Sequence, residues 1–233
     1  MKNHQAVILV AGGTGERSGQ KIPKQFVEIL NKPIILHSAE KFFYYNSQIV
    51  VVVVCHNTYT EKCQNLFRQY LPDAENIYYT NGGETRFHSV KNGLEFLRQI
   101  NFEGVVAVHD AARPCVSVSL IKRCFEIAAQ KRNAIPSVPL NESIRQIKDD
   151  NNTMVFRENY RIVQTPQCAN FSTLYNAFQQ PYQPVFTDDA NVLETFGEII
   201  HLIDGETTNI KITYPMDFII AENILSSQQK ISL

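Results

Sequence analysis

A glycine-rich segment near the start of the chain carries the residues best suited to chemistry. The apolar run Ala6 to Val10 leads directly into Ala11-Gly12-Gly13-Thr14-Gly15-Glu16-Arg17, and Pro23-Lys24-Gln25 follows. Glycines allow backbone N–H groups to converge on an anion, and the cations of Arg17 and Lys24 add charge of the complementary sign. The pattern predicts a loop that binds the phosphates of a nucleotide.

Two common phosphate-binding motifs do not fit this segment. A Walker A loop requires Gly-Lys-Ser/Thr, whereas Gly15 is followed by Glu16-Arg17. A dinucleotide fingerprint requires a third glycine where Ser18 stands and an acidic residue about 20 positions later. The next strand instead ends much later, at Cys55-His56-Asn57, without a carboxylate. Two interpretations remain: a nucleotide-binding loop of another kind, and a tight strand-to-helix turn with two solvated cations.

Further polar clusters follow other predicted strands. Gly82-Gly83-Glu84-Thr85-Arg86 comes after the strand Ile77 to Tyr79, and His109-Asp110-Ala111-Ala112-Arg113-Pro114 comes after the strand Val105 to Val108. In doubly wound sheets, ligands bind outside the carboxyl ends of the strands. We therefore expect the clusters after the first, third and fourth strands to face one cleft.

The elements that must position these clusters alternate between short β-branched runs and amphipathic stretches. This alternation predicts an α/β fold, a mostly parallel twisted sheet with helices on both faces. The strand Ile49 to Val54 is continuously apolar, as expected when both faces of a sheet are covered. The predicted helices are one opened by Pro33, one over Thr58 to Tyr70, one carrying Val90, Leu94 and Leu97, and one capped by Ser117 or Ser119.

The pattern changes from about Pro139 to Tyr160. Two alternating segments, Ser143 to Ile147 and Thr153 to Arg157, flank an Asp-Asn-rich turn and predict a β-hairpin. A hairpin is marginally stable by itself in water, so this arm either embraces a second subunit or lies as a flap on its own domain. The simplest description is a single domain over 1-233 with an arm at about 139-160.

Length and composition exclude several classes of protein. A chain of 233 residues can bury a core without disulfides or metal staples. The net charge of -1, without a terminal basic run, argues against nucleic-acid and membrane-surface binding. Five scattered cysteines suit a reducing compartment. The longest apolar run is too short to span a bilayer and no signal peptide is visible, so we expect a cytoplasmic protein.

Several short motifs together give the chain a family resemblance. Besides the glycine loop they are Gly-Gly-Glu at 82–84, His-Asp-Ala-Ala-Arg-Pro at 109–114, Thr-Pro-Gln at 165–167, Thr-Asp-Asp at 187–189 and Asn-Ile-Lys-Ile-Thr at 209–213. With these motifs in order from about residue 5 to 225, the chain resembles the 2-C-methyl-D-erythritol 4-phosphate cytidylyltransferase family of non-mevalonate isoprenoid synthesis. The resemblance implies a Rossmann-like nucleotidyltransferase fold, a Mg2+ requirement and a homodimer with exchanged β-arms.

The resemblance also implies roles for individual residues. Arg17, Lys24 and Lys211 match the catalytic cations around the CTP phosphates. The positions that match CTP-binding residues are Ala11, Gly12, Gly13, Thr14, Gly15, Gly82, Gly83, Glu84, Ser89, Asp110 and Ala111. The positions that match acceptor-binding residues are Asp110, Arg113, Thr187 and Asp188, with Ser143 and Arg157 supplied by the neighbouring subunit. The metal ligands are not predicted.

Each assignment has an alternative that requires no ligand. Without the resemblance, Lys211 would be interpreted as a solvated cation on a strand. Glu84 would be interpreted as an acidic residue near a helix N-terminus, where the helix dipole favours a negative charge. Asp110 followed three residues later by Arg113 also fits a local ion pair.

The remaining polar residues near the motifs are expected to serve structure. Thr187 and Asp188 suit the cap of a helix that begins near Ala190, a role compatible with ligand binding. His109 is expected to support the end of its strand. The cysteines are expected to pack mostly as small apolar residues, because the implied chemistry has no use for a thiol.

The implied reaction depends on charge more than on a base. The 4-phosphate of methylerythritol phosphate would attack the α-phosphorus of CTP and expel pyrophosphate. A phosphate monoester is already largely dianionic near neutral pH, because its second pKa is about 6. Catalysis should then rest on positioning and on cations, with Arg17, Lys24 and Lys211 in that role.

Two other functions remain open. The sequence Ala11-Gly12-Gly13 also suits the related ribitol 5-phosphate cytidylyltransferases, whereas the segment His109 to Pro114 favours the methylerythritol enzyme. The two acceptors are similar polyol phosphates, and a pocket separates such ligands by only about 1–3 kcal/mol. A nucleotide-binding module that has lost catalysis is the other possibility. The retained cations argue against it, because a sensor does not need groups that act on the transition state.

Overall fold

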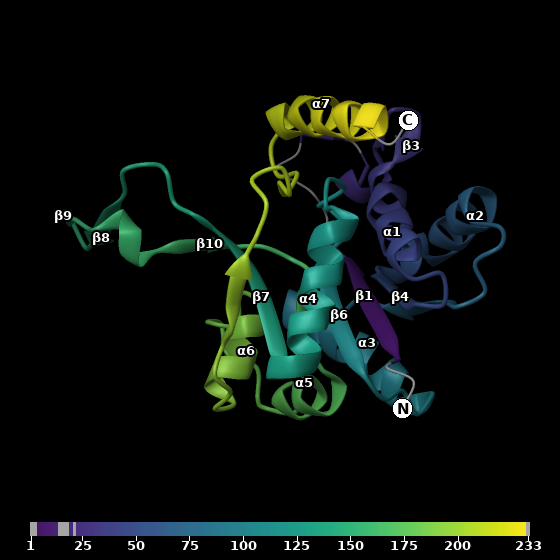
Figure 1. Ribbon diagram of the computed structural model, residues 1–233, viewed down its shortest axis with the longest axis horizontal. Coiled ribbons are helices and arrows are strands. Elements are labelled where there is room, and N and C mark those ends of the chain that lie inside the picture. The colour runs from purple at the N-terminus through teal and green to yellow at the C-terminus, as the bar shows by residue number, and fades with distance from the viewer. Residues whose placement is uncertain (1–3, 14–18, 21, 232–233) are drawn as a thin grey trace.

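A mostly parallel sheet forms the centre of the molecule (Figure 1). The computed structural model describes residues 4–13, 19–20 and 22–231. Within these residues the sheet has eight strands in the order β10-β7-β11-β6-β1-β4-β5, and β12 pairs with β7. The strands are β1 Gln5–Ala11, β4 Val50–Cys55, β5 Ile77–Asn81, β6 Val105–Asp110, β7 Asn133–Pro139, β10 Arg161–Val163, β11 Gln167–Asn170 and β12 Leu202–Asp204. The predicted α/β fold is confirmed.

The strands that carry the predicted site are parallel neighbours. β1 lies between β4 and β6, with Ala6 opposite Val50 on one side and Val106 on the other. β5 continues the parallel pairing beyond β4. β11 is antiparallel to both β6 and β7, so the sheet is mixed at that edge. The parallel part places the carboxyl ends of β1, β5 and β6 at the same edge of the sheet.

Helices cover both faces of the sheet. Alternate residues of β1 point to opposite faces, because side chains alternate along a strand. Val7 and Leu9 pack with α1, α2 and α4, whereas Ala6 and Ile8 pack with α3, α5 and α6. These helices are α1 Ile34–Tyr45, α2 Thr60–Tyr70, α3 Arg86–Gln99, α4 Val118–Lys131, α5 Phe171–Ala177 and α6 Asp189–Thr195. Of the two predicted caps for α4, Ser117 is the observed one, since its hydroxyl accepts from the backbone N–H of Leu120.

Besides the apolar clusters on the two faces of the sheet, a third one lies under the C-terminal helix, at the top of the molecule in Figure 1. The C-terminal helix α7 (Pro215–Ile231) packs through Ala221 and Leu225 onto a small hairpin made of β2 (Glu28–Ile29) and β3 (Lys32–Pro33). Ile212, in the segment that enters α7, belongs to the same cluster. This packing fixes the segment 209–213 beside the end of the sheet.

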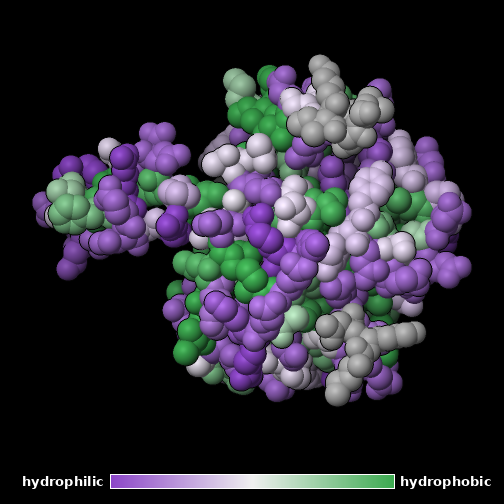
Figure 2. Space-filling view, in the orientation of Figure 1, coloured by the Kyte–Doolittle hydropathy of each residue, from purple (hydrophilic) through white to green (hydrophobic). Residues whose placement is uncertain are grey.

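The predicted β-hairpin is confirmed and projects from the body as an arm (Figure 1). Its strands are β8 (Arg145–Lys148) and β9 (Asn151–Met154), and every residue in both is exposed. Ile147, Met154 and Phe156 each expose more than 60% of their surface. Figure 2 shows this arm extending to the left of the body, with hydrophobic side chains among hydrophilic ones. The arm therefore does not lie as a flap on its own domain.

The arm strands are shorter than predicted. Ser143 precedes β8, and Arg157 begins the 3-10 turn Arg157–Asn159 instead of belonging to the second strand. In this turn the backbone N–H of Tyr160 donates to the Arg157 carbonyl at 3.0 Å, so these groups are not available to extend the hairpin ladder. The Arg157 guanidinium donates to the Asn141 carbonyl at 2.5 Å, which ties the two sides of the arm together at its base.

Candidate active site

A cleft of about 560 Å³ opens at the carboxyl ends of the parallel strands. It brings together the three polar clusters that the sequence predicted to meet. Its described lining residues are Val10, Ala11, Gly12, Gly13, Lys24, Gln25, Gly83, Glu84, Thr85, Arg86, Ser89, Asp110, Ala111, Ala112, Lys211 and Thr213. Ten of the predicted catalytic and CTP-binding positions are in this set, and Gly82 lies directly before one of them. Thr14, Gly15 and Arg17 lie outside the described residues.

The start of the glycine loop is held by the segment that follows it. Gln25 is buried, and its side-chain amide donates to the Ala11 carbonyl at 2.6 Å and to the Gly13 carbonyl at 3.3 Å. Lys24, the neighbouring residue, donates from Nζ to the Ile212 carbonyl at 2.6 Å. Gln25 thus holds the glycine loop in place, and Lys24 connects it to the segment that contains Lys211.

The second loop is packed tightly against the first turn of α3. A Cβ atom added to Gly83 would lie 2.4 Å from the Cβ of His88 and 2.9 Å from its backbone carbonyl carbon, so only glycine fits there. Ser89 is buried, accepts from the Gly83 N–H at 3.1 Å and donates to the Thr85 carbonyl at 3.0 Å. Both residues therefore shape the loop. Their contact with CTP stays a prediction.

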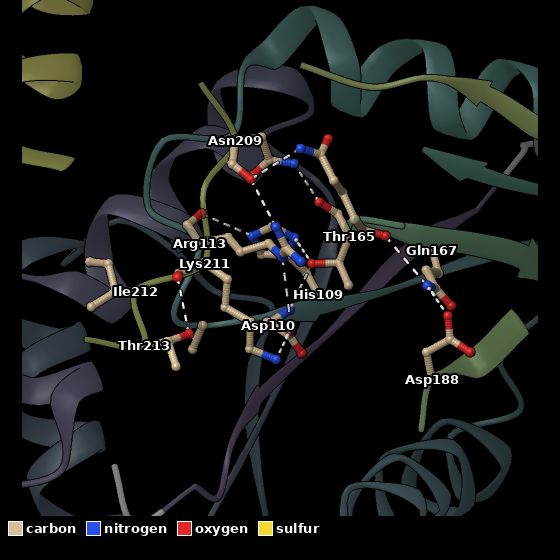
Figure 3. Close-up of polar contacts among 12 residues, drawn as sticks. His109, Asp110, Arg113, Thr165, Gln167, Asp188, Asn209, Lys211, Ile212 and Thr213 are labelled. Carbon is tan, nitrogen blue, oxygen red and sulfur yellow. Dashed lines mark hydrogen bonds and ion pairs between the residues drawn. The ribbon is translucent and has the colours of Figure 1, made fainter. Parts of the chain in front are cut away.

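Asp110 is the electrostatic centre of the cleft. One carboxylate oxygen lies 2.7 Å from Lys211 Nζ, and the other lies 3.3 Å from Arg86 Nε. Arg113 Nε lies 3.8 Å away. Figure 3 shows Lys211 reaching from the segment before α7 toward Asp110 at the end of β6. Lys211 belongs to no strand and is paired with Asp110, so the alternative of a strand cation that only solvent contacts is wrong.

These cations keep Asp110 ionised. Burial by itself would raise the pKa of the Asp110 carboxyl, but Arg86, Lys211 and Arg113 together hold that pKa well below its usual range. Burial lowers the pKa of the Arg113 guanidinium from its ordinary value, with Asp110 opposing the change. The cleft thus contains a fixed anion that orients cations around it.

His109 and Thr165 support the end of β6, as Figure 3 shows. His109 is fully buried; its Nδ1 lies 3.0 Å from the Thr165 hydroxyl oxygen and its Nε2 lies 3.2 Å from the Arg113 carbonyl. Thr165 also accepts from the backbone N–H of Asp110 at 3.1 Å. Burial lowers the pKa of His109 to about 4, so the imidazole is neutral. The structural role predicted for His109 is confirmed.

Of the predicted acceptor residues, only Asp110 belongs to the described lining of the cleft, and the others lie outside that set. Arg113 is buried behind Asp110 and donates to the Asn209 carbonyl at 2.8 Å. Asp188 caps α6, accepting from the backbone N–H of Asn191 at 2.9 Å, so the predicted cap is confirmed. Thr187 precedes it and is exposed.

The two arm residues of the acceptor set are elsewhere. Ser143 and Arg157 are both exposed and lie on the projecting arm (Figure 1), away from the described lining of the cleft. Within one chain the structure therefore does not bring them to the site.

Comparison with known proteins places this site in a family. The family model described as 2-C-methyl-D-erythritol 4-phosphate cytidylyltransferase, IspD, matches residues 5–227. The chain belongs to this family. The cytidylyltransferase of that name from Bacteroides thetaiotaomicron is 40% identical over 221 residues, which cover 95% of this chain and 99% of the relative. One from Porphyromonas gingivalis is 40% identical over 230 residues, covering 97% and 100%.

Solved structures agree with this membership. The crystal structure of the Francisella tularensis IspD cytidylyltransferase is 30% identical, with a TM-score of 0.77 over 95% of this chain and 99% of that one. The Thermus thermophilus cytidylyltransferase structure is 26% identical, with a TM-score of 0.73 over 95% and 98%. The cytidylyltransferase family and its Rossmann-like α/β fold, both predicted from the motifs, are confirmed.

Sequence reasoning missed several residues of this cytidylyltransferase site. Arg86 lines the cleft and contacts both Asp110 and Asp189, and Gln25 holds the glycine loop. Arg86 stands in the motif segment after Gly83-Glu84, and a cation at a helix start beside a predicted cleft was the signal that could have identified it. Nothing in the sequence marked its pairing with Asp189, because the partners are 103 positions apart.

The thiols and the helices give further checks. All five cysteines are free and buried, as expected for small apolar residues. None of the helices in the described part of the chain is long and apolar enough to cross a membrane. Among the same residues no group of three or more His, Cys, Asp or Glu side chains comes together as a metal cage. A cytoplasmic location stays a prediction.

Proposed function

We propose that the protein transfers the cytidylyl group of CTP to 2-C-methyl-D-erythritol 4-phosphate, giving 4-diphosphocytidyl-2-C-methyl-D-erythritol and pyrophosphate in non-mevalonate isoprenoid synthesis. One observation carries the proposal: Lys24, Lys211 and the Gly12-Gly13 backbone line the same cleft in a chain of the cytidylyltransferase family. Backbone N–H groups and cations around one cavity suit a triphosphate.

The reaction is a direct displacement at phosphorus. An oxygen of the acceptor phosphate forms a bond to the α-phosphorus of CTP, and the bond from that phosphorus to the oxygen of the leaving pyrophosphate breaks. The acceptor phosphate is already a dianion near neutral pH, since its second pKa is about 6, so it requires no protein base. His109 is not expected to act as a base, because both of its ring nitrogens already make hydrogen bonds inside the fold.

The protein contributes charge and positioning. An anion must approach a polyanion, so the cations that meet charge developing on the transferring group lower the barrier. Lys211 is held at 2.7 Å by Asp110, and Lys24 is held at 2.6 Å by the Ile212 carbonyl. Because both lysines are fixed before the substrates bind, little reorganisation is needed during the reaction. Arg17 completes the proposed set of catalytic cations.

The acceptor side of the site is proposed to be shared between two subunits. Asp110, Arg113, Thr187 and Asp188 belong to one chain, and Ser143 and Arg157 would come from the arm of a second copy. The exposed apolar residues of the arm support a homodimer, because a projecting hairpin gains stability only by packing on something. A guanidinium also matches the geometry of a phosphate.

Subunit mixing tests the shared site. Arg157→Ala and Lys24→Ala chains are each expected to be inactive alone as homodimers. In a mixed dimer with exchanged arms, the intact arm of the Lys24→Ala chain serves the intact cleft of the Arg157→Ala chain, so activity partly returns. No recovery on mixing, with a dimer seen by sedimentation, would show that each arm serves its own chain.

Mg2+ is proposed as the metal, carried mainly by the phosphates of CTP. Among the described lining residues the carboxylates are Glu84 and Asp110, and Asp110 is already compensated by Arg86, Arg113 and Lys211. This donor set fits Mg2+, which proteins often bind through one or two carboxylates together with substrate phosphates. When bound, the ion would offset phosphate charge. Glu84 and Asp110 are the lining side chains that would hold it together with those phosphates.

The acceptor is tested by a parallel assay. Gly12, which also suits ribitol 5-phosphate cytidylyltransferases, has room for a Cβ, because its nearest contact would be the Ser89 hydroxyl at 3.5 Å. Packing therefore gives no reason to assign either acceptor from this position. Pyrophosphate release with CTP and Mg2+ is expected with methylerythritol 4-phosphate. Faster release with ribitol 5-phosphate would refute methylerythritol 4-phosphate as the acceptor. No release with either compound would refute the enzymatic activity and favour a nucleotide-binding module without catalysis.

A further inference from the structure

Arg86 links the lining of the cleft to the segment that carries the predicted acceptor residue Asp188. It is the first residue of α3, directly after the loop that lines the predicted nucleotide side. Its guanidinium reaches Asp110 at the end of β6 and Asp189 at the start of α6. Asp189 follows Asp188, a predicted acceptor residue. One side chain thus joins three elements that are far apart in the sequence.

The contact with Asp189 is a two-pronged ion pair. Arg86 Nη1 donates to Asp189 Oδ1 at 2.9 Å, and Nη2 donates to Oδ2 at 2.7 Å. Arg86 Nε donates to Asp110 Oδ1 at 3.3 Å. Parallel hydrogen bonds of this kind fix orientation as well as distance. Lysine cannot reproduce this arrangement, since it offers a point charge in place of a planar fork.

Burial makes the arrangement costly to disturb. Asp189 is 1% exposed, and the side chains of Arg86 and Asp110 are 22% and 10% exposed. A carboxylate this deeply buried is tolerated only when it is paired and hydrogen-bonded. Arg86 therefore holds the start of α6 at a set position relative to Asp110.

The acceptor loop is attached to this frame from the other side. Gln167 donates to the Asp188 carboxylate at 2.9 Å and accepts from the Ala190 N–H at 2.9 Å. Figure 3 shows Gln167 and Asp188 facing each other at the edge of the network. The residues before and after Asp189 are thus fixed by Gln167, while Asp189 itself is fixed by Arg86.

We propose that Arg86 is a positioning residue that sets the acceptor side of the cleft relative to Asp110 by holding Asp189. This inference rests on the proposed function. Because Asp189 directly follows the predicted acceptor residue Asp188, loss of the Arg86–Asp189 pair displaces the acceptor more than CTP. Misplacement of a binding group by about 1 Å can lower catalytic efficiency by about 100-fold. The observable consequence is a raised KM for the acceptor.

The test compares Arg86→Lys, Asp189→Asn and the double variant in the full chain. Arg86→Lys keeps the positive charge near both carboxylates, so it is the variant most suited to folding. Arg98→Lys is the matched control, because Arg98 pairs with Glu95 on the exposed face of the same helix, with 58% of its side chain exposed. The steady-state kcat, the KM for CTP and the KM for methylerythritol phosphate are measured by pyrophosphate release.

The expected result has three parts. Each single change lowers kcat/KM for the acceptor by about 10- to 100-fold, chiefly through KM, while the KM for CTP changes by less than about threefold. The double variant is no worse than the more damaged single variant, because both changes break one pair. The control behaves as wild type. Thermal unfolding reports whether each variant is folded.

Several outcomes overturn the inference. An Asp189→Asn enzyme with normal acceptor KM would show that Arg86 acts without Asp189, for example by contacting a substrate phosphate directly. Multiplying effects in the double variant would mean that the two residues act independently. A fall in kcat with both KM values unchanged would indicate a smaller folded fraction and a purely structural role. Absence of turnover in the wild type would instead refute the proposed function.

Discussion

Replacing Lys211 with glutamine separates a catalytic cation from a structural one. Lys211 Nζ lies 2.7 Å from the Asp110 carboxylate, and 42% of the lysine side chain is exposed to solvent in the cleft. Glutamine keeps most of the length of the side chain and removes the charge. If Lys211 stabilises charge on the transferring phosphoryl group, the change affects the reaction far more than the fold.

The size of both effects follows from the geometry. Loss of one group that meets developing charge lowers kcat by about 100- to 1,000-fold, equivalent to about 2.7–4 kcal/mol. The effect on stability is much smaller, because the ion pair is open to solvent on the lysine side and is therefore screened. Pairs of that kind contribute about 0–1 kcal/mol to the free energy of unfolding.

The assay pairs steady-state pyrophosphate release with urea unfolding. Lys122→Gln is the control, because Lys122 is on the surface of α4, is 61% exposed and lies 3.8 Å from Glu126. The control should keep wild-type kcat and stability. A kcat within about threefold of wild type for Lys211→Gln would refute the electrostatic role, and so would a loss of folded protein large enough to explain the lower rate.

Three further results are expected. Asp110→Asn leaves the surrounding cations without their anion, so the free energy of unfolding by urea should fall by about 3 kcal/mol. This value is at the low end for a broken buried pair, because solvent partly screens Lys211. A loss below about 1 kcal/mol would contradict the network. Because the pKa of Asp110 is lowered in the fold, its contribution to stability is complete above the unfolded pKa of about 3.9 and is lost as pH falls through the folded value. Below about pH 4 the free energy of unfolding should therefore fall less steeply with pH in Asp110→Asn than in the wild type. Equal slopes would refute this assignment. Gly83→Ala should lose about 1–3 kcal/mol of stability, because the new Cβ would lie 2.4 Å from that of His88; Gly13→Ala, with nothing within 4 Å of its Cβ, should change stability by less than about 0.5 kcal/mol, and similar melting curves for the two variants would contradict the packing argument.

The fold could be predicted because the sheet is covered on both faces. Strands such as β4 are then continuously apolar, and the helices between them show a clear apolar stripe. The same topology places the ends of β1, β5 and β6 together, so the positions of Gly13, Gly83 and Asp110 around one cleft followed from sequence order alone.

The network behind the cleft could not be predicted in the same way. Arg86 and Asp189 form a pair across 103 positions, and no periodic pattern identifies such a partner. Likewise, the sequence did not show that Ser89 directs its hydroxyl at Gly83 N–H and the Thr85 carbonyl. Long-range polar contacts depend on the assembled fold.

The residues at which the two arm strands begin and end could not be predicted from the sequence either. The alternation that marked the hairpin continues past Met154, but pairing stops there and a 3-10 turn begins at Arg157. A strand on a projecting arm has no buried face to set its length, so local backbone hydrogen bonds decide where it ends. This is why Ser143 and Arg157 were placed on strands that do not reach them.

The most direct test of the central claim follows the oxygen atoms of the acceptor phosphate. Methylerythritol 4-phosphate labelled with heavy oxygen in its phosphate is incubated with CTP, Mg2+ and the wild-type protein, and both products are analysed by mass spectrometry. Direct attack on the α-phosphorus predicts that all of the label appears in the diphosphocytidyl product and none in pyrophosphate. Label in the pyrophosphate, or failure to form the diphosphocytidyl product, would contradict the account.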